Sequence, residues 1–198
     1  MKKFCKLAKR IDIVARILFW LCAVVGIIVA IVIVFTPVFP DDFFTEMVVT
    51  INLGQLEMEL AQEYNPSIDD LKLFFYSMSF LSLVASVFAC CMIESIRKIL
   101  KPMKEERPFE NEVSMSVKKL SWIVLIGGMV MEIGYFITQT IEYQVFDFPN
   151  LFLSDKIVKC NQEYFFDGNF LVGFLILYLL SYVFRYGEEL QIQSDETL

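Results

Sequence analysis

Nineteen consecutive residues near the amino terminus, Ile17 to Phe35 (ILFWLCAVVGIIVAIVIVF), carry no charged side chain. A helix over this run is about 28 Å long, close to the thickness of the hydrocarbon layer of a membrane. The apolar core of a cleaved signal peptide is shorter, about 7–15 residues, and the following TPVFPDD lacks a small-x-small cleavage site. The run therefore predicts a retained membrane-spanning helix.

Three further apolar segments are long enough, alone or with their flanks, to cross a membrane: Leu73 to Ile93, Leu120 to Ile141 and Phe170 to Phe184. The chain is 57% hydrophobic with a mean hydropathy of +0.58, above the roughly 45–50% apolar content of soluble proteins. We therefore predict an all-α membrane protein, a four-helix transmembrane bundle forming one domain over residues 1–198, with helices at about 11–36, 71–100, 112–142 and 166–190.

Charge predicts the orientation of these helices. Residues 1–16 carry six Lys and Arg against one acid, and residues 94–119 carry seven against five. Residues 37–72 carry eight acids and one lysine, and residues 142–167 carry five acids and two lysines. Because Lys and Arg concentrate on the cytoplasmic side, both termini are predicted to be cytoplasmic. The loop 101–111 and the tail 187–198 then lie inside, and the segments 37–70 and 143–165 lie outside.

The first outer segment changes to a period of two. Apolar residues alternate with others on both sides of Gly54-Gln55, a pattern typical of a β-hairpin, here over residues 46–60. An isolated hairpin is marginally stable, so we expect a partner strand near 151–158 and a small extracytoplasmic β-cap. The alternative is an amphipathic helix at 55–63 with irregular loops.

The side chains of common catalytic and metal sites are few. The chain has no histidine, which excludes Ser-His-Asp and Cys-His catalysis. Of its five cysteines, Cys90 and Cys91 are adjacent rather than in CxxC spacing, and only Cys160 falls in an outer segment. No phosphate-binding glycine motif is present. We predict no catalytic residue, no metal site, no cofactor and no enzyme activity.

Glu132 is an acid in the middle of an otherwise apolar segment. A charge there costs roughly 2.5–3.5 kcal/mol on insertion scales, so the carboxyl group is expected to be neutral, paired or beside water. Helical spacing places Ser121, Gly128, Glu132, Tyr135 and Gln139 on one stripe, predicted to face the bundle interior. The stripe is a candidate intramembrane polar site, either a protonatable switch or ligand pocket, or an interhelical hydrogen bond that only aids packing.

The tail FRYGEELQIQSDETL and the element RPFENE resemble the bacterial membrane family known as domain of unknown function 2975 (DUF2975). The resemblance implies a bacterial cell membrane and four helices. It also suggests a cytoplasmic helix-turn-helix regulator as a partner, since genes of that family often lie beside one. The matching, candidate partner-binding positions are Pro108, Phe109, Gly187, Leu190, Gln191, Asp195, Glu196, Thr197 and Leu198.

The acidic tail fits such a partner, because it would repel DNA but attract a basic protein surface. It is also explained by a solvated tail that only aids folding or contacts the 101–107 loop. The leading hypothesis is a non-enzymatic membrane sensor or regulator that binds lipid and a cytoplasmic regulator but not nucleic acid, and a homo-oligomer is compatible with it. The alternative is a small transporter or channel component that uses the Glu132 stripe.

Overall fold

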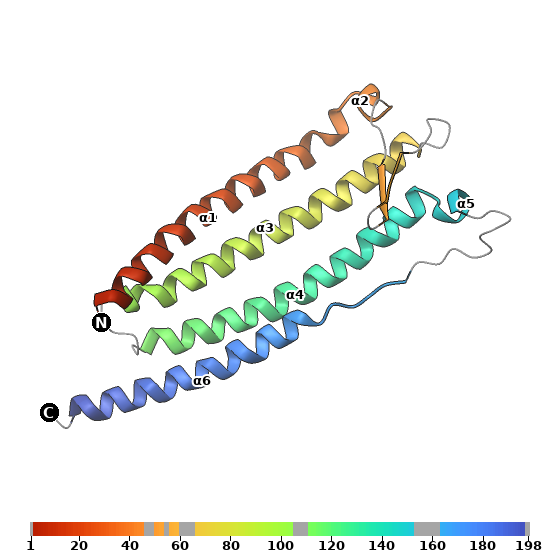
Figure 1. The fold of residues 1–198 in the computed structure, drawn as a ribbon. Coiled ribbons are helices and arrows are strands. Elements are labelled where there is room, and N and C mark those ends of the chain that lie inside the picture. Colours follow the sequence, from red (N-terminus) through yellow and green to blue (C-terminus); the bar gives the residue numbers. More distant parts are fainter. Residues whose placement is uncertain are drawn as a thin grey trace. The chain divides into compact units, whose positions relative to one another are not determined.

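The computed structural model describes residues 2–45, 50–53, 56–59, 66–104, 111–152 and 163–196. Four long helices are present: α1 (Lys2–Phe35), α3 (Ile68–Lys104), α4 (Asn111–Val145) and α6 (Asn169–Glu196) (Figure 1). Shorter elements are the 3-10 helix η1 (Thr36–Val38), the helices α2 (Asp41–Thr45) and α5 (Phe148–Phe152), and the strands β1 (Thr50–Leu53) and β2 (Leu56–Glu59).

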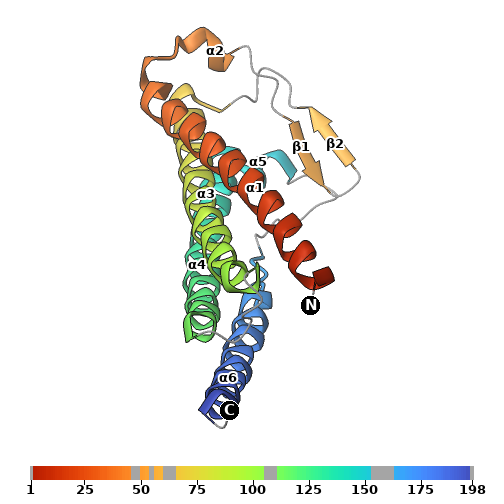
Figure 2. The same ribbon diagram turned by 90° about the vertical axis from the view of Figure 1, so that its left-hand side faces the viewer.

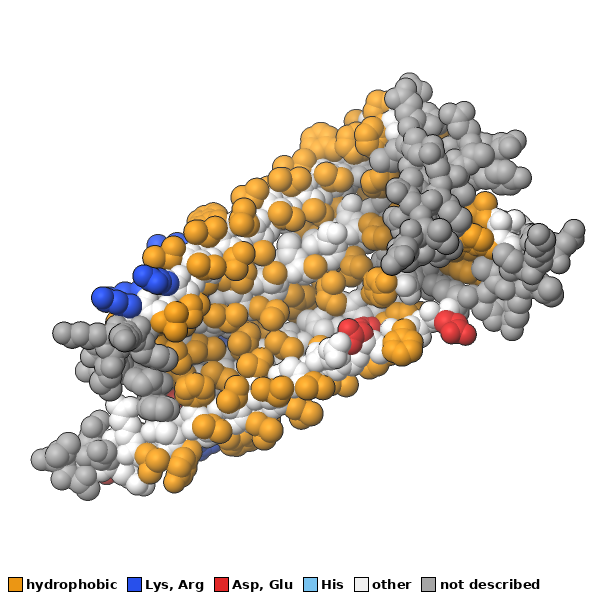
Figure 3. All heavy atoms as spheres, in the orientation of Figure 1, with side chains coloured by type: hydrophobic (Ala, Val, Ile, Leu, Met, Phe, Trp, Pro, Cys, Tyr) orange, Lys and Arg blue, Asp and Glu red, His pale blue; other side chains and the backbone are white. Residues whose placement is uncertain are grey.

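All four long helices are long and apolar enough to cross a membrane. Their large apolar side chains are exposed rather than buried: Trp20 is 64% exposed and Leu179 is also 64% exposed. Figure 3 shows hydrophobic side chains over most of the visible helical surface. In water such a surface would be unstable, whereas lipid solvates it, and backbone polar groups are satisfied inside each helix. The predicted all-α fold of a membrane protein is confirmed at this level.

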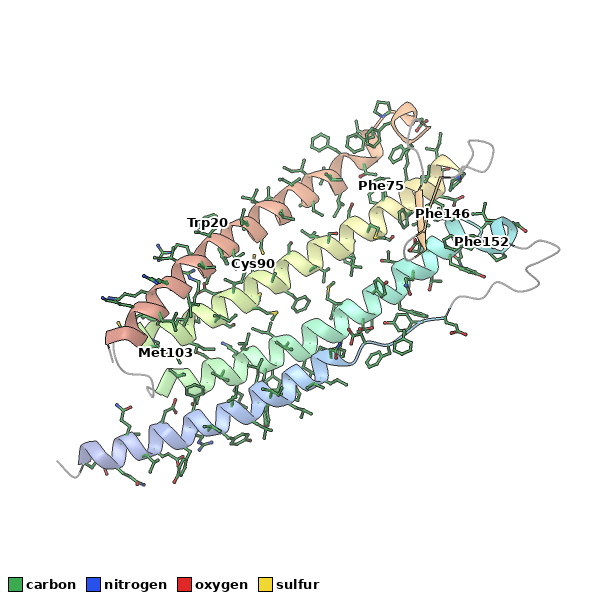
Figure 4. The ribbon with its side chains drawn as sticks, viewed as in Figure 1. Trp20, Phe75, Cys90, Met103, Phe146 and Phe152 are labelled. Carbon is green, nitrogen blue, oxygen red and sulfur yellow. The ribbon has the colours of Figure 1, made fainter. Side chains whose placement is uncertain are left out.

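The chain divides into two compact units, which are described separately. The single domain expected from the sequence stays a prediction. The first contains the described residues of Met1–Ile27, Leu83–Glu132 and Phe166–Leu198. Close helix packing within it depends on small residues: a Cβ atom added to Gly26 would lie 2.6 Å from the Ser86 hydroxyl oxygen. Cys90 on α3, labelled in Figure 4, has its sulfur 4.0 Å from the Phe19 carbonyl oxygen of α1.

The second unit contains the described residues of Ile28–Ser82 and Ile133–Phe165. Its core is aromatic and aliphatic, built from Phe44, Leu71, Val145 and Phe146. The ring of Phe44 contacts that of Phe75 edge to face, with centroids 5.8 Å apart; Figure 4 labels Phe75 on α3 and Phe146 just after α4. This cluster fixes α2 against the ends of α3 and α4 that belong to this unit.

Two strands lie where the sequence predicted a hairpin. β1 and β2 pair antiparallel, with Thr50 opposite Glu59 and Leu53 opposite Leu56 (Figure 2). The predicted three-stranded cap is not supported: the described sheet has two strands, and Leu151 and Phe152 belong to helix α5. Residues 153–158 of the expected third strand lie outside the described residues.

Local chemistry explains why α5 replaces the start of that strand. Asp147 has a positive φ of 44°, so the chain turns sharply after α4. Its carboxylate accepts a hydrogen bond from the Asn150 side chain, and its carbonyl accepts one from the Asn150 N–H at 2.9 Å. An Asp before a helix and a proline in its first turn, here Pro149, both favour a helical start.

The long helices also extend beyond their predicted bounds at several ends. α1 begins at Lys2 instead of about residue 11, and α6 begins at Asn169 and runs to Glu196 instead of 166–190. α3 continues past its predicted end at about residue 100, through Pro102, and is described to Lys104. Proline lacks the backbone N–H that would donate to the Lys98 carbonyl, so α3 forgoes one hydrogen bond there, and the Pro102 side chain is buried.

Candidate functional site

The first polar cluster of the first unit surrounds Asp12 on α1. Its carboxylate accepts a hydrogen bond from the Lys104 ammonium at 2.8 Å and lies 3.5 Å from Nε of Arg97, and both cations come from α3. Asp12 is 6% exposed. The Cys5 thiol also donates to the Lys104 carbonyl at 2.9 Å. Together these contacts join the amino-terminal turns of α1 to the last turns of α3.

This arrangement explains why an acid sits in the basic amino-terminal segment. A carboxylate buried to this degree is destabilising unless cations and hydrogen-bond donors surround it. Lys104 and Arg97 supply both, and Arg16, one turn along α1, approaches Asp12 at 3.9 Å. The cluster therefore fixes the pairing of α1 with α3.

The second polar cluster joins α4 to the tail portion of α6. The Glu188 carboxylate accepts hydrogen bonds from the Ser114 N–H at 3.0 Å and the Ser114 hydroxyl at 2.8 Å. Ser114 is the fourth residue of α4, near the amino-terminal end of the helix, where the dipole favours an anion. Glu188 is 4% exposed. This buried contact therefore joins the start of α4 to α6, and we call it the α4–α6 clasp.

A groove lies beside the α4–α6 clasp, between the same two helices. It has a volume of about 540 Å³ and is lined by charged, hydroxyl and apolar side chains, among them Lys118, Tyr182, Arg185, Glu189 and Ile192. The Lys118 ammonium lies 5.8 Å from the centre of the Tyr178 ring. Arg185 lies 3.5 Å from a Glu189 oxygen in an exposed pair. The groove thus offers two cations beside apolar surface.

The structure does not bring the predicted Glu132 stripe together as one buried site. Ser121 is fully buried, and its hydroxyl donates to the Lys118 carbonyl within the same helix. At Gly128 an added Cβ would overlap the Phe170 ring, so this position is close-packed. Glu132 is partly buried, and Tyr135, in the second unit, is 51% exposed.

Tyr135 and Gln139, the remaining members of the stripe, are linked to each other. The Gln139 amide donates to the Tyr135 hydroxyl at 3.1 Å, and the Tyr135 ring contacts Tyr164 with centroids 6.5 Å apart. Spacing of i and i+4 on α4 accounts for this hydrogen bond. Ser121, Gly128 and Glu132 belong to the first unit and Tyr135 and Gln139 to the second, and the interior orientation of the whole stripe stays a prediction.

All of the predicted partner-binding residues that the structure describes lie on the last turns of α6. Leu190 is 48% exposed, and Gly187 and Gln191 are partly buried. Glu196 is exposed, and Asp195 belongs to the helix. Pro108, Phe109, Thr197 and Leu198 lie outside the described residues.

Sequence reasoning did not identify Asp12, Glu188 or Ser114 as contact residues. Glu188 belongs to the acidic tail of the sequence but lies only four residues after Phe184, the end of the apolar segment, and helical spacing places it on one side of α6 with Ser181 and Arg185. This helical spacing is the local sequence signal that Glu188 faces a neighbouring helix. Among the described residues, no group of three His, Cys, Asp or Glu side chains is placed to hold a metal ion.

The structure has four long apolar helices, and the two polar clusters lie near helix ends. This places the chain in the class of all-α, multi-pass membrane proteins. Within that class the chain belongs to the family described as protein of unknown function DUF3611, whose model matches residues 1–145. The predicted membership of DUF2975 is therefore wrong, because its motifs were short and the longer match is to another family. No curated protein and no solved structure matches the chain.

Proposed function

We propose that this chain is a non-enzymatic, multi-pass membrane regulator whose carboxyl-terminal helix binds a basic protein in the cytoplasm. The observation that supports the proposal is that α6 continues as a helix to Glu196, well past its apolar segment, and presents exposed Leu190 and Glu196. A helix with apolar and acidic side chains in its last turns suits a partner surface that is basic with an apolar centre.

The proposed orientation rests on charge. The first turns of α1 carry exposed Lys6, Lys9 and Arg10, and Figure 3 shows Lys and Arg gathered where Figure 1 places the start of α1. With four crossings, a cytoplasmic amino terminus returns the end of α6 to the same side. The bacterial cell membrane remains part of the proposal.

The identity of the partner is now defined only by its chemistry. A helix-turn-helix regulator was suggested by the resemblance to DUF2975, and the family match removes that support. A DNA-binding protein still has the basic surface that an acidic helix end would bind, and we keep it as the proposed partner. Because the tail is acidic, we expect no direct contact of this chain with nucleic acid.

The test is site-specific photocrosslinking from the exposed position Leu190 in intact cells, followed by identification of the crosslinked protein. Deleting residues 187–198 is a poor test, because it also removes the Glu188 contact with Ser114. Substituting Asp195 and Glu196 by Lys leaves that contact in place and should abolish crosslinking to a basic partner. Crosslinks to lipid alone, or crosslinks that persist after the charge reversal, would reject the proposal.

The transporter alternative has less support from the packing. Gly128 of the Glu132 stripe is filled by the Phe170 ring and Ser121 is fully buried, so this part of the stripe packs helices. Its test is proton or ion flux through liposomes that contain the wild-type chain or Glu132→Gln. A Glu132-dependent flux would favour the transporter over the regulator.

A further inference from the structure

We propose that the groove between α4 and α6 binds the phosphate headgroup of a membrane phospholipid, held between Lys118 and Arg185. The two cations come from different helices and line one cavity of about 540 Å³. This inference does not depend on the protein partner proposed above.

The depth of the groove matches that of a headgroup. Lys118 lies two residues before the apolar segment Leu120–Ile141 begins, and Arg185 follows directly after the segment Phe170–Phe184. Charged side chains at the ends of apolar helices lie at the level of lipid headgroups. Trp122, one turn beyond Lys118, is 46% exposed, and indole rings favour the same level.

The walls of the groove suit a lipid better than a soluble anion. Met115 is 66% exposed and Tyr182 is 51% exposed, and both line the groove. On α6 the apolar surface continues away from the groove through Val183 and Leu179, which are 63% and 64% exposed. An acyl chain lying on this surface would add to the binding of the headgroup, and a free phosphate has no such contact.

Glu188 and Glu189 also line the groove. A phosphate can bind there only if these two carboxylates leave Lys118 and Arg185 available. Glu188 directs both oxygens at Ser114. Glu189 approaches Arg185 at 3.5 Å, but these side chains are 60% and 69% exposed, and such surface pairs are weak. A lipid phosphate can therefore replace Glu189 as the partner of Arg185. Removing this competing carboxylate in Glu189→Gln should strengthen lipid binding, whereas removing either cation should weaken it.

The experiment measures lipid bound to the full-length protein in detergent, by native mass spectrometry, with phosphatidylglycerol, an uncharged diacylglycerol and free glycerol phosphate as probes. Phosphatidylglycerol should bind, and its affinity should fall about fivefold for each of Lys118→Gln and Arg185→Gln. Glu189→Gln should increase that affinity. Lys119→Gln, next in the chain but outside the groove lining, should leave it unchanged, and Lys118→Arg should retain it.

Three outcomes would overturn the inference. Equal binding of diacylglycerol and phosphatidylglycerol would show that the phosphate is not recognised. Glycerol phosphate that binds as tightly as phosphatidylglycerol, with the same dependence on Lys118 and Arg185, would identify a soluble phosphate compound instead. Phosphatidylglycerol binding that both Gln variants leave intact, in protein with unchanged helix content, would place the lipid elsewhere.

Discussion

The Glu188 carboxylate contacts Ser114, which lies 74 positions earlier in the chain. Removing the carboxylate should therefore weaken the packing of α6 against the start of α4. Glu188→Gln replaces a charged acceptor by an amide at the first turn of α4, so we expect a loss of about 1.5–3 kcal/mol in the free energy of unfolding. Ser114→Ala removes one of two donors and should cost about 1 kcal/mol. Reversible unfolding in mixed micelles measures both values.

The matched control for the α4–α6 clasp is Glu189→Gln, the adjacent acid, whose side chain is 60% exposed. It should change stability by about 0–1 kcal/mol. In the Ser114→Ala, Glu188→Gln double variant, the two losses should be less than additive, because the variants share one contact. Full additivity would contradict the hydrogen bonds described.

Gly128 and Gly173 provide a second residue-level comparison, because both lie where α4 meets α6. A Cβ at Gly128 would overlap the Phe170 ring, whereas one at Gly173 would lie 3.5 Å from Val124, at ordinary contact distance. Gly128→Ala should lower the thermal midpoint, because the ring or the helix must move. Gly173→Ala should leave it unchanged or raise it, because alanine favours a helix by up to about 1 kcal/mol.

At the scale of elements, the Asp12 cluster holds α1 against α3. Asp12→Asn removes the carboxylate that Lys104 and Arg97 share, and we expect a loss of about 2–3 kcal/mol in the free energy of unfolding. Removing one partner of a fully buried pair costs roughly 3–5 kcal/mol, and the value here is smaller because the two cations are 25% and 27% exposed. Hydrogen exchange of the last turns of α3 should rise together with the loss.

The control for Asp12→Asn is Glu94→Gln, which removes contacts of an exposed acid with Arg97 and Lys98 on the same helix. Its side chain is 44% exposed, so the expected change is about 0–1 kcal/mol. If both variants destabilise the protein equally, the buried contact between α1 and α3 does not have the role described.

The elements themselves were predictable wherever the signal is local. Lipid requires about 20 apolar residues in one helix, so each spanning segment is visible in the sequence. Asp12 and Glu188 were not predictable as contacts, because they meet partners 92 and 74 residues away and no local period reveals such a pairing. Leu151 and Phe152, at the start of the predicted third strand, are helical instead, because Asp147 and Pro149 favour a helical turn.

At the scale of the whole molecule, the remaining prediction is orientation. The first apolar segment is flanked in the sequence by charges of opposite sign. Exposed bases of α1, such as Lys6 and Lys9, precede it, and the acid-rich segment 37–70 follows it. Epitope tags at both ends should therefore be protected from protease in sealed, right-side-out vesicles, because both termini are proposed to be inside. A tag inserted after Pro66, in the outer segment, should be cleaved in the same vesicles.

A further arm of the experiment tests whether charge is the cause. Changing Lys6, Lys9 and Arg10 to Gln removes three of the six amino-terminal bases without altering the Asp12 contacts, and it should expose the amino-terminal tag in a fraction of the molecules. Lys72→Gln, which removes the only base of residues 37–72, should strengthen the normal orientation. A carboxyl-terminal tag cleaved in the wild-type chain would place the end of α6 outside, and the proposed contact with a cytoplasmic protein would then be excluded.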